Sequence, residues 1–185
     1  MLLSAVGVSS YRMFTGAEEP FFTAPFTSPS PVVLDFGPTP CPASVDAKYP
    51  APKKVTVNTL NASALQGAAA AASQSLETRG FKTGEVKNAG IDFAGTILIR
   101  TGAKGVDRAY TLLAHAPADA VLAFDARDDD SVDLVVGEEY EGLRPVAEVA
   151  VESGAVIETP PQCTPVAELV ASADSAAEPP PPEPK

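Results

Sequence analysis

The sequence has few of the residues that most catalytic and metal sites require. It contains one histidine, His115, two cysteines and no tryptophan in 185 residues. A zinc site needs three or four ligands, and a Ser-His-Asp arrangement would have to use this one histidine. Neither a Gly-X-Ser-X-Gly elbow nor a P-loop is present. The sequence therefore predicts no catalytic residue, no metal and no cofactor. His115 lies at the end of a predicted helix, where a cation interacts favourably with the helix dipole, and this is sufficient to explain its presence.

Basic residues are also scarce. The segment from Lys53 to Arg144 holds 10 basic and 13 acidic residues, a net charge of −3, in a chain whose formal net charge is −11. The remaining acidity belongs to the two flanks. A domain without an excess of basic residues gains no counterion release on binding phosphate backbones, so no nucleic-acid partner is expected.

The sequence has no long hydrophobic run. The N-terminal stretch Leu2 to Val8 is far shorter than the roughly 20 residues that span a bilayer. It also lacks the positive region and cleavage site of a signal peptide. Two interpretations stay open: a frayed terminus, or a remnant of a membrane anchor in residues 1–15, whose transmembrane helix would begin upstream of Met1.

Proline is absent between Lys53 and Ala116, although the chain has 19 prolines. The gap predicts one folded domain, assigned to residues 53–165. Residues 16–52 are expected to form a Pro-rich linker, and residues 166–185 an acidic, Pro-rich and disordered tail. The tail is interpreted as a spacer, with a protein-binding segment as the alternative.

Within the domain, Val55 and Val57 alternate with polar residues, as in a half-buried strand. Ser63 and Gln66 form a capping-box pattern, which predicts that a helix starts there. Its apolar face would consist of Leu65, Ala68, Ala69, Ala72 and Leu76.

The later patterns predict further strands and a second helix. Strands are expected at 81–87, 96–100, 120–126 and 131–136, with the second helix at 105–115 and an ambiguous segment at 145–154. The strand at 96–100 is apolar on both faces and is expected to be central. The element order predicts an α+β fold, a small two-layer sandwich with helices on one face of a mixed sheet.

The two cysteines, Cys41 and Cys163, lie on opposite sides of the predicted core. Neither belongs to a Cys-X-X-Cys motif, so neither is expected to be catalytic or metal-binding. An even count suits an oxidising compartment, and a disulfide between them would tie both flanks to one end of the domain. Two unrelated free thiols in exposed segments remain the alternative.

Residues 125–133 form the densest run of acidic residues. The spacing does not match an EF-hand loop, because Val136 occupies the twelfth position of a loop that starts at Asp125, where a bidentate glutamate is needed. A solvated turn between two strands explains the run better than a calcium site.

The best candidate for binding a small ligand is Asn61 with Ser63, at the predicted start of the first helix. Free N–H groups and the helix dipole there attract phosphate or carboxylate groups. Simple capping by Ser63 is the competing explanation. The sharper hypothesis is that this turn binds a glycan or a peptide carboxylate.

Several of these positions together resemble the LytR C-terminal domain family. The resemblance covers about Lys53 to Leu143 and is specific as a whole rather than at any single residue. It is carried by Val55-Thr-Val57, Leu60-Asn61, Gly67-Ala68, Leu76, Gly80-Phe81, Thr96-Ile97, Asp133-Leu-Val-Val-Gly137 and Glu139-Tyr140.

The resemblance implies an extracytoplasmic role without catalysis. In LytR-type proteins this domain accompanies a separate phosphotransferase domain, and some actinobacterial envelope proteins carry it alone behind one transmembrane helix. The implied function is a membrane-anchored, non-enzymatic module that contributes to envelope integrity by binding wall glycan or envelope proteins. A soluble enzyme with an unrecognised active site is the alternative.

Overall fold

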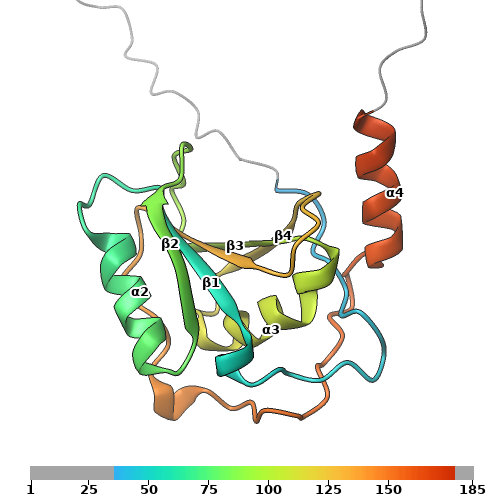
Figure 1. Cartoon of the computed structure of the whole chain (residues 1–185), viewed down its shortest axis with the longest axis horizontal. Coiled ribbons are helices and arrows are strands. Elements are labelled where there is room, and N and C mark those ends of the chain that lie inside the picture. Colours follow the sequence, from blue (N-terminus) through green and yellow to red (C-terminus); the bar gives the residue numbers. More distant parts are fainter. Residues whose placement is uncertain (1–35, 178–185) are drawn as a thin grey trace, which may run out of the picture. The chain divides into compact units, whose positions relative to one another are not determined.

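The computed structural model describes residues 36–177 (Figure 1). Its centre is one mixed sheet of five strands in the order β2-β1-β5-β3-β4. Strand β1 runs parallel to β2 and β5, β3 runs parallel to β4, and β3 and β5 are antiparallel. The strands are β1 (Thr56–Asn61), β2 (Lys82–Asn88), β3 (Ile97–Thr101), β4 (Val121–Phe124) and β5 (Val132–Val136).

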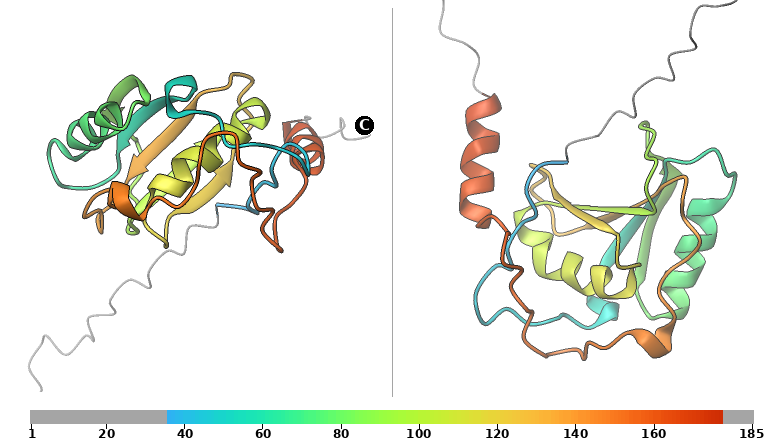
Figure 2. Two further views of the ribbon diagram at one scale, coloured as in Figure 1. Left: turned by 90° about the horizontal axis from the view of Figure 1, so that it is seen from below. Right: turned by 180° about the vertical axis from the view of Figure 1, so that it is seen from behind.

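Two helices cover one face of the sheet (Figures 1 and 2). Helix α2 (Ala68–Thr78) packs on β1 and β2, and α3 (Val106–His115) packs on β3. Their buried side chains form one cluster with that face, in which alanines of α2 allow helix and sheet to approach closely. The α+β sandwich predicted from the element order is therefore confirmed, including the interior position of β3.

The opposite face of the sheet carries no helix of the described chain, and we call it the open face. Its apolar part is a smaller cluster built on Leu60, Leu98 and Val135. Phe93 closes this cluster, and Phe36 meets Phe93 edge to face at 5.4 Å between ring centroids. The centre of the open face is polar instead and is described below.

The prediction of a linker over residues 16–52 is wrong for its described part, residues 36–52. This segment lies on the domain, with Ala47 buried in the main core. The Tyr110 hydroxyl donates to the Pro40 carbonyl at 2.7 Å, and the Thr111 hydroxyl donates to the Pro50 carbonyl at 3.0 Å. Proline-rich composition favours extended chain, and here polar groups of α3 hold that extended chain in place. Residues 1–35, including the anchor remnant expected at 1–15, lie outside the described residues.

The disordered tail predicted for residues 166–185 begins too early. Val166–Ala177 form helix α4, whose first turn packs on the domain through Val166 and the buried Leu169. The prolines that predict a disordered tail all follow residue 177, and the segment before them is rich in alanine, the strongest helix former. Residues 178–185 lie outside the described range. Within residues 36–177 no helix is both long and apolar enough to cross a bilayer.

The remaining helical segments within residues 36–177 are three short 3-10 turns. They are η1 (Pro52–Lys54), η2 (Ala103–Gly105) and η3 (Val146–Glu148). The last of these is all the regular structure in the segment 145–154 that the sequence left ambiguous.

Candidate functional site

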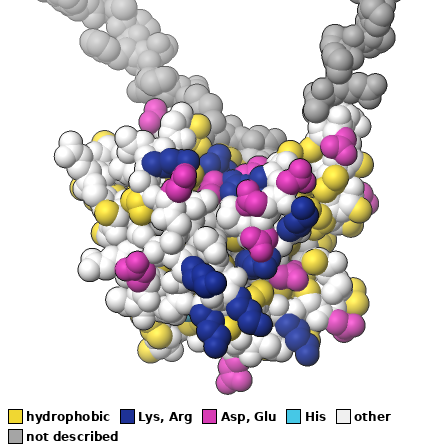
Figure 3. All heavy atoms as spheres, viewed as in Figure 1, with side chains coloured by type: hydrophobic (Ala, Val, Ile, Leu, Met, Phe, Trp, Pro, Cys, Tyr) yellow, Lys and Arg dark blue, Asp and Glu magenta, His cyan; other side chains and the backbone are white. Residues whose placement is uncertain are grey.

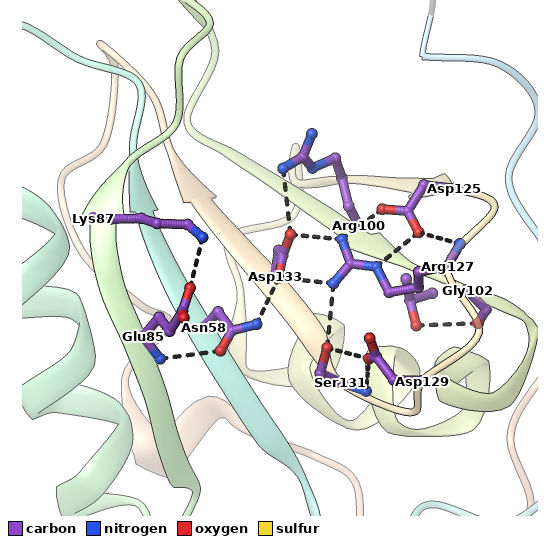
Figure 4. Close-up of polar contacts among 11 residues, drawn as sticks. Asn58, Glu85, Lys87, Arg100, Gly102, Asp125, Arg127, Asp129, Ser131 and Asp133 are labelled. Carbon is purple, nitrogen blue, oxygen red and sulfur yellow. Dashed lines mark hydrogen bonds and ion pairs between the residues drawn. The ribbon is translucent and has the colours of Figure 1, made fainter.

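A row of polar side chains crosses the middle of the open face. In the sheet register Asn58 of β1 lies beside Asp133 of β5, and Asp133 lies beside Arg100 of β3. Arg127, from the loop between β4 and β5, reaches over the same carboxylate (Figure 4). Asp133 is 6 % exposed, so a buried charged group lies at the centre of a row whose other side chains are half-buried.

The carboxylate of Asp133 is fully occupied by donors. Its Oδ1 accepts hydrogen bonds from Asn58 Nδ2 at 3.0 Å and from Arg127 Nη1 at 2.8 Å. Its Oδ2 accepts from Arg127 Nη2 at 2.6 Å and from Arg100 Nη2 at 3.3 Å. A carboxylate has about four lone-pair sites, so none is left for a substrate or a metal ion. We conclude that Asp133 holds strands and loop together rather than performing chemistry.

The charges of this cluster stabilise one another. Burial raises the pKa of Asp133, but hydrogen bonds from Arg127 and Asn58 and the nearby positive charges outweigh it and hold the pKa below its usual value. Hydrogen bonds to Asp133 and Asp125 raise the pKa of Arg127 above its usual value. Both groups stay ionised, as a buried pair must if it is to compensate its desolvation.

The interpretation of residues 125–133 as a solvated turn holds only for part of the run. Asp128, Asp129 and Asp130 are exposed. Asp125 instead accepts a hydrogen bond from Arg127 Nε at 2.8 Å, and Asp133 belongs to β5 rather than to the turn. The sequence reasoning missed this cluster because it grouped Asp133 with its acidic neighbours. The signal was an aspartate inside the apolar run Val132 to Val136.

Asn61 and Ser63 do come together, but not at the start of a helix. Asn61 Oδ1 accepts hydrogen bonds from the Ser63 backbone N at 3.1 Å and from its Oγ at 2.9 Å. Asn61 Nδ2 donates to the Leu65 carbonyl at 3.0 Å. These bonds close a turn of their own directly after β1.

The predicted capping box at Ser63 and Gln66 is therefore wrong. Helix α2 begins at Ala68, and its N-cap is Gly67, whose φ of 81° favours glycine. Ser63 Oγ accepts from the Leu65 backbone N at 3.2 Å, and Leu65, expected on the buried face, is 63 % exposed. The asparagine turn takes the Ser63 backbone N–H, which is one of the two donors of the capping box, and the Ser63 hydroxyl accepts from Leu65 instead of Gln66. The helix dipole consequently does not act at Asn61 and Ser63.

A polar hollow of about 400 Å³ nevertheless opens at this turn. We call it the carboxyl-end hollow, because the parallel strands β1 and β2 end beside it, and β5 ends close by. Ligands of open parallel sheets commonly bind at such ends. Glu138, just after β5, braces the turn by accepting a hydrogen bond from the Ala64 backbone N at 2.8 Å. The lining residues are Asn61, Ala62, Ser63, Ala64, Gln66, Asn88, Gly90, Ile91 and Asp92.

Two further hollows, of about 520 and 530 Å³, share Pro117, Glu141 and Gly142 in their walls. Their other carboxylates include Glu148 in one and Asp119 in the other. Among residues 36–177 no group of three or more His, Cys, Asp or Glu side chains is arranged to hold a metal ion. Charged side chains of both signs are mixed over the face shown in Figure 3, without a large patch of one sign.

His115 does lie at the end of α3, but it is not the cation that was expected there. It is 9 % exposed and packs edge to face on Phe81, with 5.0 Å between ring centroids. Burial lowers its pKa, and the positive charges of Arg79 and Arg144 lower it further. The imidazole is therefore neutral near pH 7, and its Nδ1 has no hydrogen-bond partner within the described protein.

Cys41 and Cys163 are joined by a disulfide in the structure. Each half of the link is also held by backbone pairing, since Cys41 N donates to Thr164 O at 2.8 Å and Thr164 N donates to Thr39 O at 2.8 Å. The residues on either side of the domain thus run together at one place. Ala43 N adds a hydrogen bond of 3.0 Å to Asp107 of α3.

The segment that contains the sheet is similar to known proteins. Residues 54–140 match the family model described as LytR cell envelope-related transcriptional attenuator. No curated protein sequence matches the chain significantly. Among solved structures, the fold is similar to the soluble domain of a conserved hypothetical secreted protein from Mycobacterium marinum, with a TM-score of 0.53 and 24 % sequence identity over 72 % of this chain and 91 % of that one. At this identity the likeness establishes the fold alone. The segment matched by the family runs from η1 past β5 and contains the whole sheet.

Proposed function

Because residues 54–140 match the family model of the LytR C-terminal domain, we propose that the protein is a non-enzymatic module of the cell envelope. It acts outside the cytoplasmic membrane and binds wall components or envelope proteins, and so contributes to envelope integrity. A single transmembrane helix upstream of the domain would anchor it there, as in the family members that carry this domain alone.

The observation that carries the location is the disulfide between Cys41 and Cys163. Disulfides persist in oxidising compartments and are rare where glutathione and thioredoxin keep thiols reduced. Pairing across a separation of 122 residues also keeps both flanking segments at one end of the domain. Such a layout suits a domain that is tethered on one side and leaves its other surfaces free to bind.

The absence of catalysis is supported by how the reactive groups are used. Asp133 has all its acceptor sites filled, and His115 is buried beside two arginines. A general base must reach the substrate proton with a free lone pair. Asp133 has no free lone pair, and His115 is too deeply buried to reach a substrate.

The binding site we propose is the carboxyl-end hollow, with Asn61 and Ser63 on its rim. The hollow offers amide and hydroxyl groups from Asn61, Ser63, Gln66 and Asn88, which suit the hydroxyl and amide groups of a wall glycan or its peptide. Replacing Asn61 and Ser63 together by alanine should reduce binding of the full chain to purified peptidoglycan in a pull-down. Ser172→Ala, on exposed α4, is the matched control and should bind like the unmodified protein.

Unchanged pull-down by the Asn61→Ala, Ser63→Ala double variant would remove this hollow from the proposal.

A soluble enzyme is the competing function, and the location of the protein in the cell distinguishes the two. Recovery of the protein from the cytosol with both thiols reduced would favour the enzyme. Crosslinking to wall polymer or to envelope proteins supports the binding module.

A further inference from the structure

Strand β2 forms one edge of the sheet, and it is open to solvent. All its residues except the half-buried Thr83 are exposed. An edge strand presents unpaired N–H and C=O groups, which another strand can use. The strand runs over seven residues, whereas β4 at the other edge has four.

The direction of the unpaired groups follows from the bonds to β1. Lys82 N donates to Val55 O at 3.0 Å and Ala89 N donates to Asn61 O at 2.8 Å. Glu85 N donates to the Asn58 side chain, where the register between β1 and β2 shifts. Because backbone groups alternate in direction along a strand, Val86 points its N–H and C=O away from β1. The strand is regular from Val86 onward.

The side chains around Val86 are arranged so that two copies of the strand would complement each other. Val86 is an exposed apolar residue, at 48 %. Glu85 and Lys87 lie on the other face of the strand, 68 % and 60 % exposed at their side chains, and form an ion pair of 2.6 Å with each other. Figure 4 shows this pair at the end of the polar row that crosses the open face.

We propose that two copies of this chain associate through β2, antiparallel and centred on Val86. This register sets Val86 opposite Val86 of the second copy, Glu85 opposite Lys87, and Lys87 opposite Glu85. Opposite charges on directly facing residues stabilise an antiparallel pair, and like charges destabilise it. Moving the centre by one residue would set Glu85 against Glu85 or Lys87 against Lys87. The charge pattern thus selects the register centred on Val86, with the two-fold symmetry typical of dimers.

Helix α2 leaves room for this contact. It lies against both β1 and β2. With strands about 4.8 Å apart, a helix midway over β1 and β2 would lie about 10 Å from its symmetry mate, within the range of packed helices. The exposed residues of α2 include Ala70, Ala71 and Gln74, which allow two helices to approach.

Charge reversal on the full chain tests the proposal by sedimentation equilibrium over micromolar to millimolar protein. The unmodified chain should show a concentration-dependent increase toward twice the monomer mass. Glu85→Lys and Lys87→Glu should each weaken association by about tenfold, because every cross-strand charge pair becomes repulsive. An equimolar mixture of the two variants should associate again, and so should the double variant E85K/K87E, in which the charges are exchanged. Thermal unfolding of each variant checks that the exposed substitutions leave the fold intact.

Two results would overturn the proposal. The first is an unmodified chain that stays monomeric at millimolar concentration, which would leave this edge to an extended segment of another protein. The second is a dimer whose dissociation constant is the same in Glu85→Lys, in Lys87→Glu and in their mixture.

Discussion

Arg127 donates two parallel hydrogen bonds to Asp133, from Nη1 to Oδ1 at 2.8 Å and from Nη2 to Oδ2 at 2.6 Å. The same guanidinium binds Asp125, so one side chain fixes the loop between β4 and β5 to the open face. Two-bond geometry of this kind is specific to arginine, since lysine cannot reproduce it.

Replacing Arg127 by methionine should destabilise the fold by about 3 kcal/mol, because Asp133 would be left as a buried charge without its main partner. The additional change Asp133→Leu should recover part of this loss, since it removes the uncompensated charge. Urea unfolding measures both. The exposed ion pair of Lys87 and Glu85 offers the matched control. Lys87→Met should lower the free energy of unfolding by less than about 0.5 kcal/mol. Equal losses for Arg127→Met and Lys87→Met would contradict the role of this cluster.

Stability should also depend on pH through His115, the single histidine. Its pKa is lowered in the folded protein, so the unfolded chain binds the proton more readily. The contribution to stability is complete above the ordinary histidine pKa of about 6.5 and is lost as the pH falls from there toward the folded pKa. Urea unfolding between pH 5 and 8 should show this loss. His115→Phe should flatten the curve over that range, and an unchanged slope would show that another group is responsible.

The disulfide should contribute strongly to stability. In the chain-entropy model a link that closes a loop of more than 100 residues stabilises by about 4 to 5 kcal/mol. Replacing Cys41 and Cys163 together by serine should therefore lower the melting temperature by about 10 °C in a chain of this size. Dithiothreitol should lower the melting temperature of the unmodified protein by the same amount and leave the double variant unaffected. A melting temperature equal to that of the oxidised protein would contradict this expectation.

Gly137 should not tolerate a side chain. A Cβ at this position would lie 2.0 Å from the Gly95 carbonyl oxygen and 2.6 Å from the Phe93 ring. Gly137→Ala is expected to cost about 2 kcal/mol or more, as overpacking does in a closely packed site. Ala94→Ser, exposed and beside Gly95, should change the free energy of unfolding by less than about 0.5 kcal/mol. Similar stabilities of the two variants would argue against the close approach.

The periodicity of the sequence predicts the elements and their layering because apolar spacing reports directly which face is buried. Strand and helix patterns around Val57, Leu98 and Ala109 sufficed for the α+β fold. What the pattern could not reveal was local competition for hydrogen bonds. Asn61 captures Ser63 and Leu65, which delays α2 to Ala68.

Polar contacts between residues far apart in the chain could not be predicted from the sequence for a related reason. Arg127 and Asp133 come from a loop and a strand, and their partners Asn58 and Arg100 are 75 and 33 residues from Asp133. Composition likewise could not predict that residues 36–52 pack on the domain, because an ordered extended chain and a disordered linker are rich in the same residue types. The cysteines were informative, since they suggested the link that joins the two flanks.

The most direct test of the envelope account is the thiol state of the protein in its native cells. Intact cells would be treated with a thiol-reactive maleimide, fractionated, and the protein examined by non-reducing mass spectrometry. The account predicts recovery from the envelope fraction with Cys41 and Cys163 linked and unmodified. Recovery from the cytosol with maleimide on both cysteines would contradict it.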